Sequence, residues 1–447
     1  MSAENLLWGV SLAIAAAIVA PYAFSFRRRR HVDRARKDEA ARLGVDRPAA
    51  QFPFVDAMRC IGCGACVDAC PEGDVLGIVG GMATVVNGLR CVGHGRCAEA
   101  CAVGAIAVGL GDLKSRKDIP LLDDWQESSV PGLFIAGELG GLALVKNAIA
   151  QACTVAERVG QRASGGGPAV GGNVFDLLVV GAGPAGLATA AAAHERGLSH
   201  VVLEQESDLG GTIFHYPRRK LVLVQSVEIP VLGQLREGEY SKEDLLELFK
   251  ELCQRAALDV RFGERVQGIE RDGELFLVRS RSGVTRARFV VLALGRRGTP
   301  RKLGVPGEES PKVMYQLADA ESYRGQRILI VGGGDSAVEA AIGLARQPGN
   351  RVSLSYRREK LVRIKRRNEE RVSGLLSSDH IEGLFGSEVE EIGARSVRLR
   401  TATGPREVPN DYVFVFAGGQ PPFELLRSAG VRFGGEASAS RAGGSPS

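Results

Sequence analysis

The sequence predicts an α/β protein with two related α/β domains, a small cysteine-rich α+β module ahead of them and an N-terminal transmembrane helix. Short apolar runs that pass through glycine-rich turns into helical stretches begin at Leu177 and Ile328, a pattern typical of α/β domains. Seven of the nine cysteines lie between Cys60 and Cys101. The residues from Leu6 to Phe26 carry no charge.

Length and composition are ordinary for a globular protein, apart from glycine. The 447 residues suggest about three domains beyond the helix. The net charge of +5 is small and partly local to one arginine run, so it predicts no nucleic-acid partner. With 58 glycines, short glycine motifs arise easily by chance, and each motif below is therefore weighed with its surroundings.

The uncharged stretch from Leu6 to Phe26 predicts a membrane anchor. As a helix it would be about 31 Å long, which is enough to cross the hydrocarbon core of a bilayer. Four arginines, Arg27 to Arg30, follow it, whereas only Glu4 is charged before it, so the later domains are expected in the cytoplasm. A cleaved signal peptide would carry its positive charge ahead of the apolar stretch. We expect a single-pass protein of the cell inner membrane, with lipid as the partner of the helix.

The cysteine-rich module carries the spacing of an iron–sulfur protein. The first motif is C-x-x-C-x-x-C-x-x-x-C followed by Pro71, formed by Cys60, Cys63, Cys66 and Cys70. This is the bacterial [4Fe–4S] pattern, in which one short loop wraps a cluster and the fourth thiolate reaches a second one. A zinc site would need two separated pairs instead.

An imperfect second copy consists of Cys91, His94, Cys97 and Cys101. Over roughly sixty residues the region resembles two-cluster bacterial ferredoxins. The resemblance implies one cluster on Cys60, Cys63, Cys66 and Cys101, and another on Cys70, Cys91 and Cys97. His94 replaces the second cysteine of the copy, and Ala102 replaces its proline. Three interpretations of His94 stay open: an iron ligand that raises the potential, a three-iron cluster without it, and a histidine that does not coordinate.

The first glycine motif predicts a dinucleotide site in a Rossmann-like domain. A strand from Asp176 leads into Gly181, Gly183 and Gly186 and then an alanine-rich helix, and the next strand ends on Glu204. The glycines let the backbone approach a pyrophosphate at a helix N-terminus, and the acid binds ribose hydroxyls.

The second motif places Gly332, Gly334 and Ala337 after a strand from Arg327. Its second strand ends on Arg357 and Arg358 rather than on an acid, with Arg363 and Lys365 close behind. Arginine suits the 2′-phosphate of NADPH, whereas a carboxylate suits the free hydroxyl of NADH. The alternative is a solvated basic loop in which Glu359 takes the ribose.

Residues 175–435 resemble the thioredoxin-reductase-like family of flavoproteins. The resemblance also rests on Val290–Gly295 and on Gly210 and Gly211, and it implies FAD in the first site, with Gly211 and Gly295 near it, and NADPH in the second. The redox Cys-x-x-Cys of that family is missing from residues 313–323. Cys153 and Cys253 are solitary and are expected to be packing residues.

The order of the FAD domain departs from the family pattern. The family ends with Pro-Gly-x-Phe-x-x-Gly-Asp after the NADPH domain, but here a similar segment runs from Pro131 to Gly137 and Glu138, ahead of the first glycine motif. We interpret this as a circular permutation, with Gly137 and Glu138 beside FAD and a helix beginning near Gly140 directed at the flavin. The permutation also brings the iron–sulfur module directly before this segment.

The expected domains are a transmembrane anchor (1–30), a charged tether (31–51), a ferredoxin-like domain (52–111), a permuted FAD-domain segment (112–163), a linker (164–173), an FAD domain (174–311), an NADPH domain (312–416), and a return to the FAD domain with a disordered tail (417–447).

The resulting hypothesis is a membrane-anchored oxidoreductase. It would pass electrons between NADPH, FAD, a [4Fe–4S] cluster, a second cluster ([4Fe–4S] or [3Fe–4S]) and a protein or quinone-like acceptor, in either direction. The cofactors supply the chemistry, so no side chain is expected to act as a catalytic acid or base. Two alternatives are a low-molecular-weight disulfide reductase and a redox-sensing or relay subunit of a membrane complex. Formation of a homodimer is left open.

Overall fold

The computed structural model describes residues 3–44, 51–109, 117–141, 144–163, 174–296 and 298–435, and the statements below concern these residues. They form two compact units. Unit 1 comprises residues Met1–Gly109 and Val362–Arg367, and unit 2 comprises Leu110–Leu361 and Asn368–Ser447. The predicted linker at 164–173 and the tail from 436 onward lie outside the described residues.

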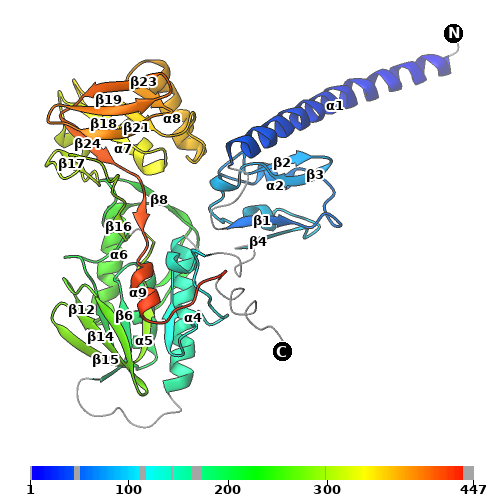
Figure 1. Cartoon of the computed structure of the whole chain (residues 1–447). Helices are drawn as coiled ribbons and strands as arrows, with labels where there is room; N and C mark the ends of the chain where they lie inside the picture. The colour runs from blue at the N-terminus through cyan, green and yellow to red at the C-terminus, as the bar shows by residue number, and fades with distance from the viewer. Residues whose placement is uncertain are drawn as a thin grey trace, which may run out of the picture. The chain divides into compact units, whose positions relative to one another are not determined.

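Unit 1 begins with one long helix, α1 (Ala3–Leu43). The segment expected as a separate charged tether begins as the last third of this helix, residues 31–43. It packs on the cysteine-rich module: the N–H of Ile78 donates to Asp33 Oδ2 at 2.8 Å, and Arg36 lies 2.8 Å from Asp74. Figure 1 shows the end of α1 beside β2 (Leu76–Val79).

The module is a small α+β fold. Its other elements are β1 (Phe52–Val55), α2 (Ala65–Asp68), β3 (Met82–Val85), a 3-10 turn η1 (Gly88–Arg90), α3 (Arg96–Glu99) and β4 (Ile106–Gly109). β1 pairs antiparallel with β4, and β2 pairs antiparallel with β3. The core combines aliphatic side chains such as Val75 and Ile78 with the buried Cys66 and Cys97. Because the fold is so small, cysteine side chains make up much of its interior.

The two halves of the module repeat each other in local geometry. Gly64 precedes α2 with φ 84°, and Gly95 precedes α3 with φ 81°. Only glycine adopts this left-handed conformation readily, so both turns depend on it. Cys63 and His94 stand immediately before these glycines and therefore occupy equivalent positions of the repeat.

Unit 2 contains an α/β domain built on a seven-stranded sheet in the order β12-β7-β6-β15-β14-β13, with β5 also paired to β15. Its strands are β5 (Leu133–Ile135), β6 (Val174–Val180), β7 (His200–Leu203), β12 (Val260–Arg261), β13 (Gly268–Asp272), β14 (Leu275–Ser280) and β15 (Gly283–Leu292). Its helices are α4 (Val145–Ala163), α5 (Pro184–Glu195) and α6 (Lys242–Arg255). Two short hairpins use β8 (Leu221–Val224) with β11 (Gly238–Ser241), and β9 (Val227–Ile229) with β10 (Gly233–Leu235).

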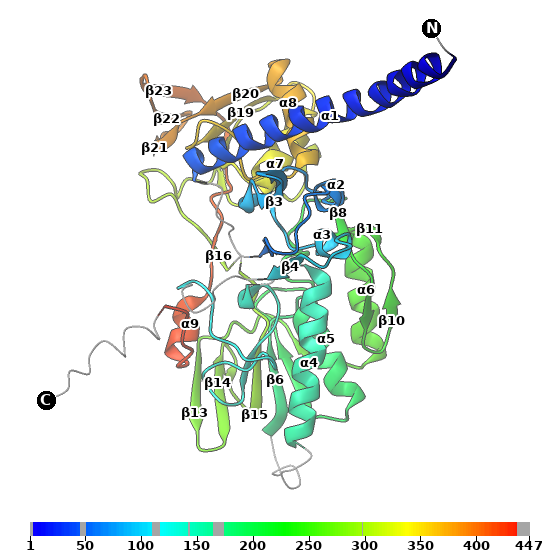
Figure 2. The same cartoon turned by 90° about the vertical axis from the view of Figure 1, so that its right-hand side faces the viewer.

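The segment ahead of the glycine motif is part of this sheet. β5 pairs parallel with the end of β15, joining Leu133 to Val290, and the N–H of Ala136 donates to Leu292 O at 3.1 Å. α4 packs on α5, as Figure 2 shows, and the alanine-rich faces of both helices allow a close approach. The segment interpreted as permuted thus adds a strand to the sheet of this domain from ahead of the glycine motif.

α4 begins later than the sequence suggests. A 3-10 turn η3 (Glu138–Gly140) follows β5, and the helix starts only at Val145 rather than near Gly140. Gly141 and Leu144 both have φ of 96°, which is incompatible with a right-handed helix. From Val145 onward, the buried residues Ala148, Ala152, Val155 and Val159 form the apolar stripe that anchors the helix.

The second α/β domain of unit 2 has a five-stranded parallel sheet in the order β17-β24-β18-β19-β20 and a three-stranded antiparallel sheet in the order β21-β22-β23. Its strands are β17 (Val313–Met314), β18 (Arg327–Val331), β19 (Arg351–Tyr356), β20 (Ile381–Phe385), β21 (Glu388–Ile392), β22 (Ser396–Thr401), β23 (Gly404–Pro409) and β24 (Tyr412–Val415). Its helical elements are η4 (Ala320–Ser322), α7 (Asp335–Ala345) and α8 (Arg366–Ser377).

The chain then returns to the first domain. β16 (Thr299–Pro300) and β25 (Gly419–Gln420) form an antiparallel pair in the two connecting strands. α9 (Phe423–Ser428) follows, and Leu426 and Phe433 are fully buried in the core of the first domain. The N–H of Leu121 donates to Arg432 O at 2.9 Å. The C-terminal segment thus covers the face of the sheet opposite α4 and α5.

Candidate functional site

The cysteines of unit 1 form two groups. The pKa of Cys66 is raised to about 11, chiefly by burial and then by the nearby Cys60 and Cys63. The pKa of Cys91 is also raised to about 11, chiefly by burial, with Cys70 and Cys97 among the further causes. Cys97 also raises the pKa of Cys66, and burial and, less strongly, Cys101 raise that of Cys97, so the neighbours partly cross the two sets that the ferredoxin resemblance implies.

Within the described residues no three Cys, His, Asp or Glu side chains are arranged around a single metal ion, and it is the chemistry of the buried thiols that fits iron–sulfur clusters. Burial disfavours a free thiolate, so thiolates gathered here need bound metal to compensate their charge. Backbone N–H groups are directed at the sulfurs: Ala83 donates to Cys60 Sγ at 3.3 Å, and Ala105 donates to Cys101 Sγ at 3.2 Å. Such hydrogen bonds tune cluster potentials.

His94 is held by a residue that the sequence did not single out. Its Nε2 lies 3.0 Å from Glu72 Oε1, and the two side chains are only 10% and 9% exposed. Glu72 is two residues beyond Cys70, so the pair lies within the second group of thiols. The carboxylate was missed because 22 residues separate it from His94 in the chain.

The first glycine turn of unit 2 is shaped to receive a dinucleotide. Gly181 has φ 107°, and a Cβ there would lie 2.6 Å from Ala293 O. A Cβ on Gly186 would lie 1.8 Å from Gly181 O, and one on Gly211 would lie 3.1 Å from Gly183 Cα. Side chains are therefore excluded along the turn, which leaves its backbone open to a pyrophosphate at the start of α5.

The acid after the second strand is directed at the same turn. Glu204 is buried, and its Oε2 accepts the N–H of Ala182 at 2.5 Å while Oε1 accepts the N–H of Glu206 at 2.9 Å. Each carboxylate oxygen has a second lone pair, so ribose hydroxyls fit there as well. Gly295, with φ 62°, follows β15 beside Thr212. The predicted flavin residues of this domain thus come together.

The segment that follows β5 brings Gly137 next to α5, the helix that follows the first glycine turn. Gly137 has φ 87°, and a Cβ there would lie 3.1 Å from the Cβ of Ala185 in α5. Glu138 follows immediately and is half-buried. The N–H of Gly137 donates to Gln151 Oε1 at 2.8 Å. Gln151 was not predicted, although a buried glutamine in an apolar helix face would have been a signal.

The second glycine turn has the same construction. A Cβ on Gly332 would lie 2.5 Å from Phe416 O, and one on Gly333 would lie 2.2 Å from the ring of Tyr356. Ala337 is fully buried against the turn, and Gly334 caps α7. This geometry fits the pyrophosphate of a nicotinamide dinucleotide.

The basic residues that would select the coenzyme do not all lie in the same unit of the structure. Arg357 and Arg358 directly follow β19, at the end of the sheet where the glycine turn lies. Arg357 is exposed and Arg358 is half-buried. Arg363 stands in the segment Val362–Arg367, which belongs to unit 1. Arg357 and Arg358 are therefore the residues that unit 2 itself offers to a 2′-phosphate.

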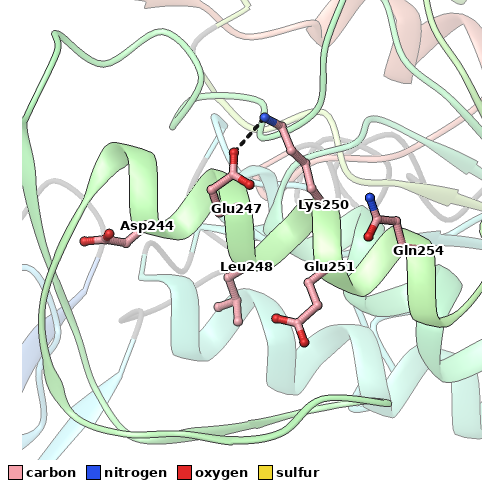
Figure 3. Close-up of a pocket in the computed structure, with 6 residues that line it drawn as sticks. All are labelled: Asp244, Glu247, Leu248, Lys250, Glu251 and Gln254. Atoms are coloured by element: carbon pink, nitrogen blue, oxygen red, sulfur yellow. Dashed lines mark hydrogen bonds and ion pairs between the residues drawn. The ribbon is translucent and has the colours of Figure 1, made fainter.

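A surface hollow of about 430 Å³ lies along α6 and is lined by Asp244, Glu247, Leu248, Lys250, Glu251 and Gln254. Figure 3 shows these side chains. Lys250 Nζ lies 2.9 Å from Glu247 Oε1 across this helix face. None of the predicted site residues lines the hollow, so it is separate from the dinucleotide turns.

The glycine turn yields a direct test. We expect Gly186→Ala to weaken FAD binding about 5- to 150-fold, since overpacking of this kind costs about 1–3 kcal/mol. Bound flavin per protein after dialysis, read from its visible absorbance, measures the effect. Gly268→Ala is the matched control, because a Cβ there meets nothing within 4 Å. Undiminished flavin in the Gly186 variant would exclude the turn as the FAD site.

Two turns of this kind, on successive α/β domains of a chain that also carries a thiol-rich module, define a two-dinucleotide oxidoreductase. Residues 178–438 match the family model described as pyridine nucleotide-disulphide oxidoreductase, and residues 52–102 match the 4Fe–4S dicluster domain. The first match covers more than half of the chain, which therefore belongs to the pyridine nucleotide-disulphide oxidoreductase family. It is an FAD-dependent enzyme of that family with an added 4Fe–4S domain.

Individual relatives agree with this assignment. The chain is 29% identical over 269 residues to a ferredoxin–NADP reductase of Ignicoccus hospitalis, covering 58% of this chain and 83% of that protein. It is 32% identical over 264 residues to a thioredoxin reductase of Mycolicibacterium smegmatis, covering 57% and 78%. Among solved structures, a bacillithiol disulfide reductase from Staphylococcus aureus matches with a TM-score of 0.54 and 25% identity over 58% of this chain and 81% of that one.

Proposed function

We propose that the protein is a membrane-anchored, NADPH-dependent oxidoreductase that exchanges electrons between NADPH and a membrane-associated acceptor. The observation that carries this proposal is the combination, in one chain, of two dinucleotide turns with a two-group thiol module. Its ferredoxin–NADP reductase relatives support electron transfer, and they also leave the reverse direction open. When bound, FAD exchanges a hydride with the nicotinamide and single electrons with iron–sulfur clusters.

The residues of the chain position these groups and do no acid–base chemistry of their own. The turn of Gly181 and Gly186, with Glu204, would hold FAD, and Gly137 with Glu138 would close the site from β5. The turn of Gly332 and Gly334, with Arg357 and Arg358, would hold NADPH. The cysteines of unit 1 would hold the clusters.

The absence of a dithiol from residues 313–323 favours an iron–sulfur outlet over a protein disulfide. The remaining thiols are poor substitutes: burial raises the pKa of Cys153, and it raises that of Cys253 to about 11. A reactive cysteine needs a lowered pKa and access to solvent. Both residues pack against the apolar core of the first domain, as expected for packing residues.

A second candidate is reduction of a low-molecular-weight disulfide by the flavin half. The structural likeness to a bacillithiol disulfide reductase favours it. Stopped-flow mixing of the purified holoprotein with NADPH, followed at flavin and cluster wavelengths, tests between the two. Flavin bleaching followed by cluster bleaching supports the proposed function. Rapid NADPH oxidation that requires an added small disulfide, with no cluster bleaching, supports the alternative.

The anchor is proposed from α1. In the described part of the chain, α1 is the one helix long and apolar enough, by length and composition, to cross a membrane. Trp8, Leu12, Ile18 and Phe24 are all more than 65% exposed, on every side of the helix. A helix that is apolar all round and exposed needs an apolar medium, which lipid provides.

The same helix would hold the iron–sulfur module close to the membrane. Asp33, which binds the backbone of β2, comes seven residues after Phe26, about 10 Å further along the helix axis. A continuous helix is a stiffer spacer than an extended tether. We propose that this short distance between the module and the membrane favours an acceptor in the membrane or docked on its cytoplasmic surface. Such an acceptor would be a quinone-like molecule or a membrane protein.

The anchor leads to a fractionation test. Removal of residues 1–26 should move the protein from the salt-washed membrane fraction to the soluble fraction, because the apolar helix is lost. The cluster spectrum should be unchanged, because Asp33 and Arg36 remain. Replacing Arg27–Arg30 by glutamine in the full chain is the control that retains the apolar stretch. A mature protein that starts after the apolar stretch in cells would show a signal peptide instead.

A further inference from the structure

The two copies of the repeat in the iron–sulfur module differ in chemistry at two positions. Glu72 lies two residues beyond Cys70, and the equivalent residue beyond Cys101 is Val103. Likewise, His94 stands where the first half has Cys63. Glu72 follows the first copy and His94 belongs to the second, but both accompany the set of Cys70, Cys91 and Cys97 that the resemblance implies for one cluster. The corresponding residues of the other set are Val103 and Cys63.

The two unusual residues contact each other. His94 Nε2 lies 3.0 Å from Glu72 Oε1, and both side chains are about nine-tenths buried. A carboxylate only accepts hydrogen bonds, so Nε2 donates and the lone pair of the neutral ring is on Nδ1. Nδ1 is also the ring nitrogen nearer to the backbone. Its distance from the backbone is therefore closer to that of a cysteine sulfur than the distance of Nε2 is.

We propose that Glu72 is a positioning residue that holds His94 as the fourth iron ligand of the second cluster through Nδ1. This inference rests on the proposed iron–sulfur function and deepens it. Metal-binding histidines commonly donate their other N–H to a carboxylate, which sets the tautomer and the ring orientation. The backbone supports the assignment, since the left-handed glycine after His94 repeats the turn after Cys63.

A structural ion pair is the competing explanation for Glu72. Lys365, in the segment that belongs to unit 1, lies 4.0 Å from the same carboxylate oxygen, with half of its side chain exposed. An ion pair at 4.0 Å in which the lysine is half exposed contributes little. It does not explain why His94 is the nearer and more buried partner.

The test uses the full chain with its cofactors in detergent. Histidine labelled with ¹⁵N should give a nitrogen hyperfine coupling on one cluster of the wild-type protein, and His94→Cys should remove that coupling. Glu72→Ala should abolish or broaden it and increase loss of one iron to a chelator about 10- to 100-fold. Glu72→Gln keeps a hydrogen-bond acceptor and should retain the coupling.

The His94→Cys background separates positioning from general stability. With cysteine as ligand, Glu72→Ala should leave the iron count unchanged, and the first cluster serves as an internal control in every variant. Lys365→Ala should have no effect. No histidine coupling in the wild type, equal iron loss in both backgrounds, or loss reproduced by Lys365→Ala would each overturn the proposal. None of these readouts uses NADPH or the acceptor, so they do not depend on how turnover experiments come out.

Discussion

Replacing Arg357 and Arg358 together by alanine is expected to weaken NADPH binding about 10²- to 10⁴-fold. Each charge-assisted bond to a phosphate is worth about 1.5–3 kcal/mol, and two such bonds give about 3–6 kcal/mol. The exposure of Arg357 favours the lower end of this range. NADH lacks the 2′-phosphate, so its binding should change by about threefold or less. Titration of the protein with each coenzyme measures both constants.

The control for this test is Arg351→Ala. Arg351 is exposed like Arg357 but stands at the opposite end of β19, away from the glycine turn. Equal losses for NADPH and NADH in the double variant would show that the two arginines do not recognise the phosphate. A larger loss of NADH from Glu359→Ala would favour the solvated-loop interpretation of this segment.

The sheet of the first domain illustrates what could be predicted from local sequence. The segment from Pro131 to Glu138 repeats a pattern of apolar strand and glycine turn, and its strand β5 pairs with β15 although 155 or more residues separate the partners. A place for this segment in the sheet was predictable from the resemblance of residues 131–138 to the family's Pro-Gly-x-Phe-x-x-Gly-Asp element. The start of α4 was not predictable, since nothing in the local sequence marks the positive φ of Leu144.

The site residues that escaped prediction are those whose role depends on a distant partner. Gln151 binds the N–H of Gly137 from within a helix, and Tyr356 covers Gly333 from the next strand. Glu72 looks like an ordinary surface acid after a Cys-Pro pair. In each case the contact forms only when the fold brings two distant segments together. The spacing of residues in the sequence does not predict such a contact.

The same reasoning applies to α1. The charged stretch after Arg30 has the composition of a solvated linker, and nothing in its order marks Asp33 as special. Asp33 is largely buried because it accepts the N–H of Ile78 at the edge of a two-stranded sheet. An edge strand leaves backbone groups without sheet partners, and a side chain of the helix satisfies one of them here.

Replacement of Cys63 by serine is expected to separate the two halves of the proposed electron path. Cys63 is exposed and stands just before the turn of Gly64. Two apolar residues shortly before it in the chain are also exposed, Ile61 at 68% and Met58 at 94%. Among the predicted cluster ligands of unit 1, Cys63 is the most exposed cysteine, and the apolar side chains beside it suit a partner surface. The serine variant should therefore damage the cluster on the accessible side of the module.

Flavin reduction by NADPH should keep its wild-type rate in the Cys63→Ser protein, because the glycine turns of unit 2 are untouched. Turnover with the proposed membrane acceptor should fall about 10²-fold or more. Loss of a residue that hydrogen-bonds a metal ligand typically lowers activity about 10- to 100-fold, and loss of a ligand itself should lower it further. Cys253→Ser, which removes a buried thiol of unit 2, should change neither rate. Single-turnover flavin bleaching and steady-state reduction of the acceptor in native membranes give the two rates. Full turnover in the Cys63 variant would mean that the flavin half works without the clusters and would favour the disulfide-reductase alternative.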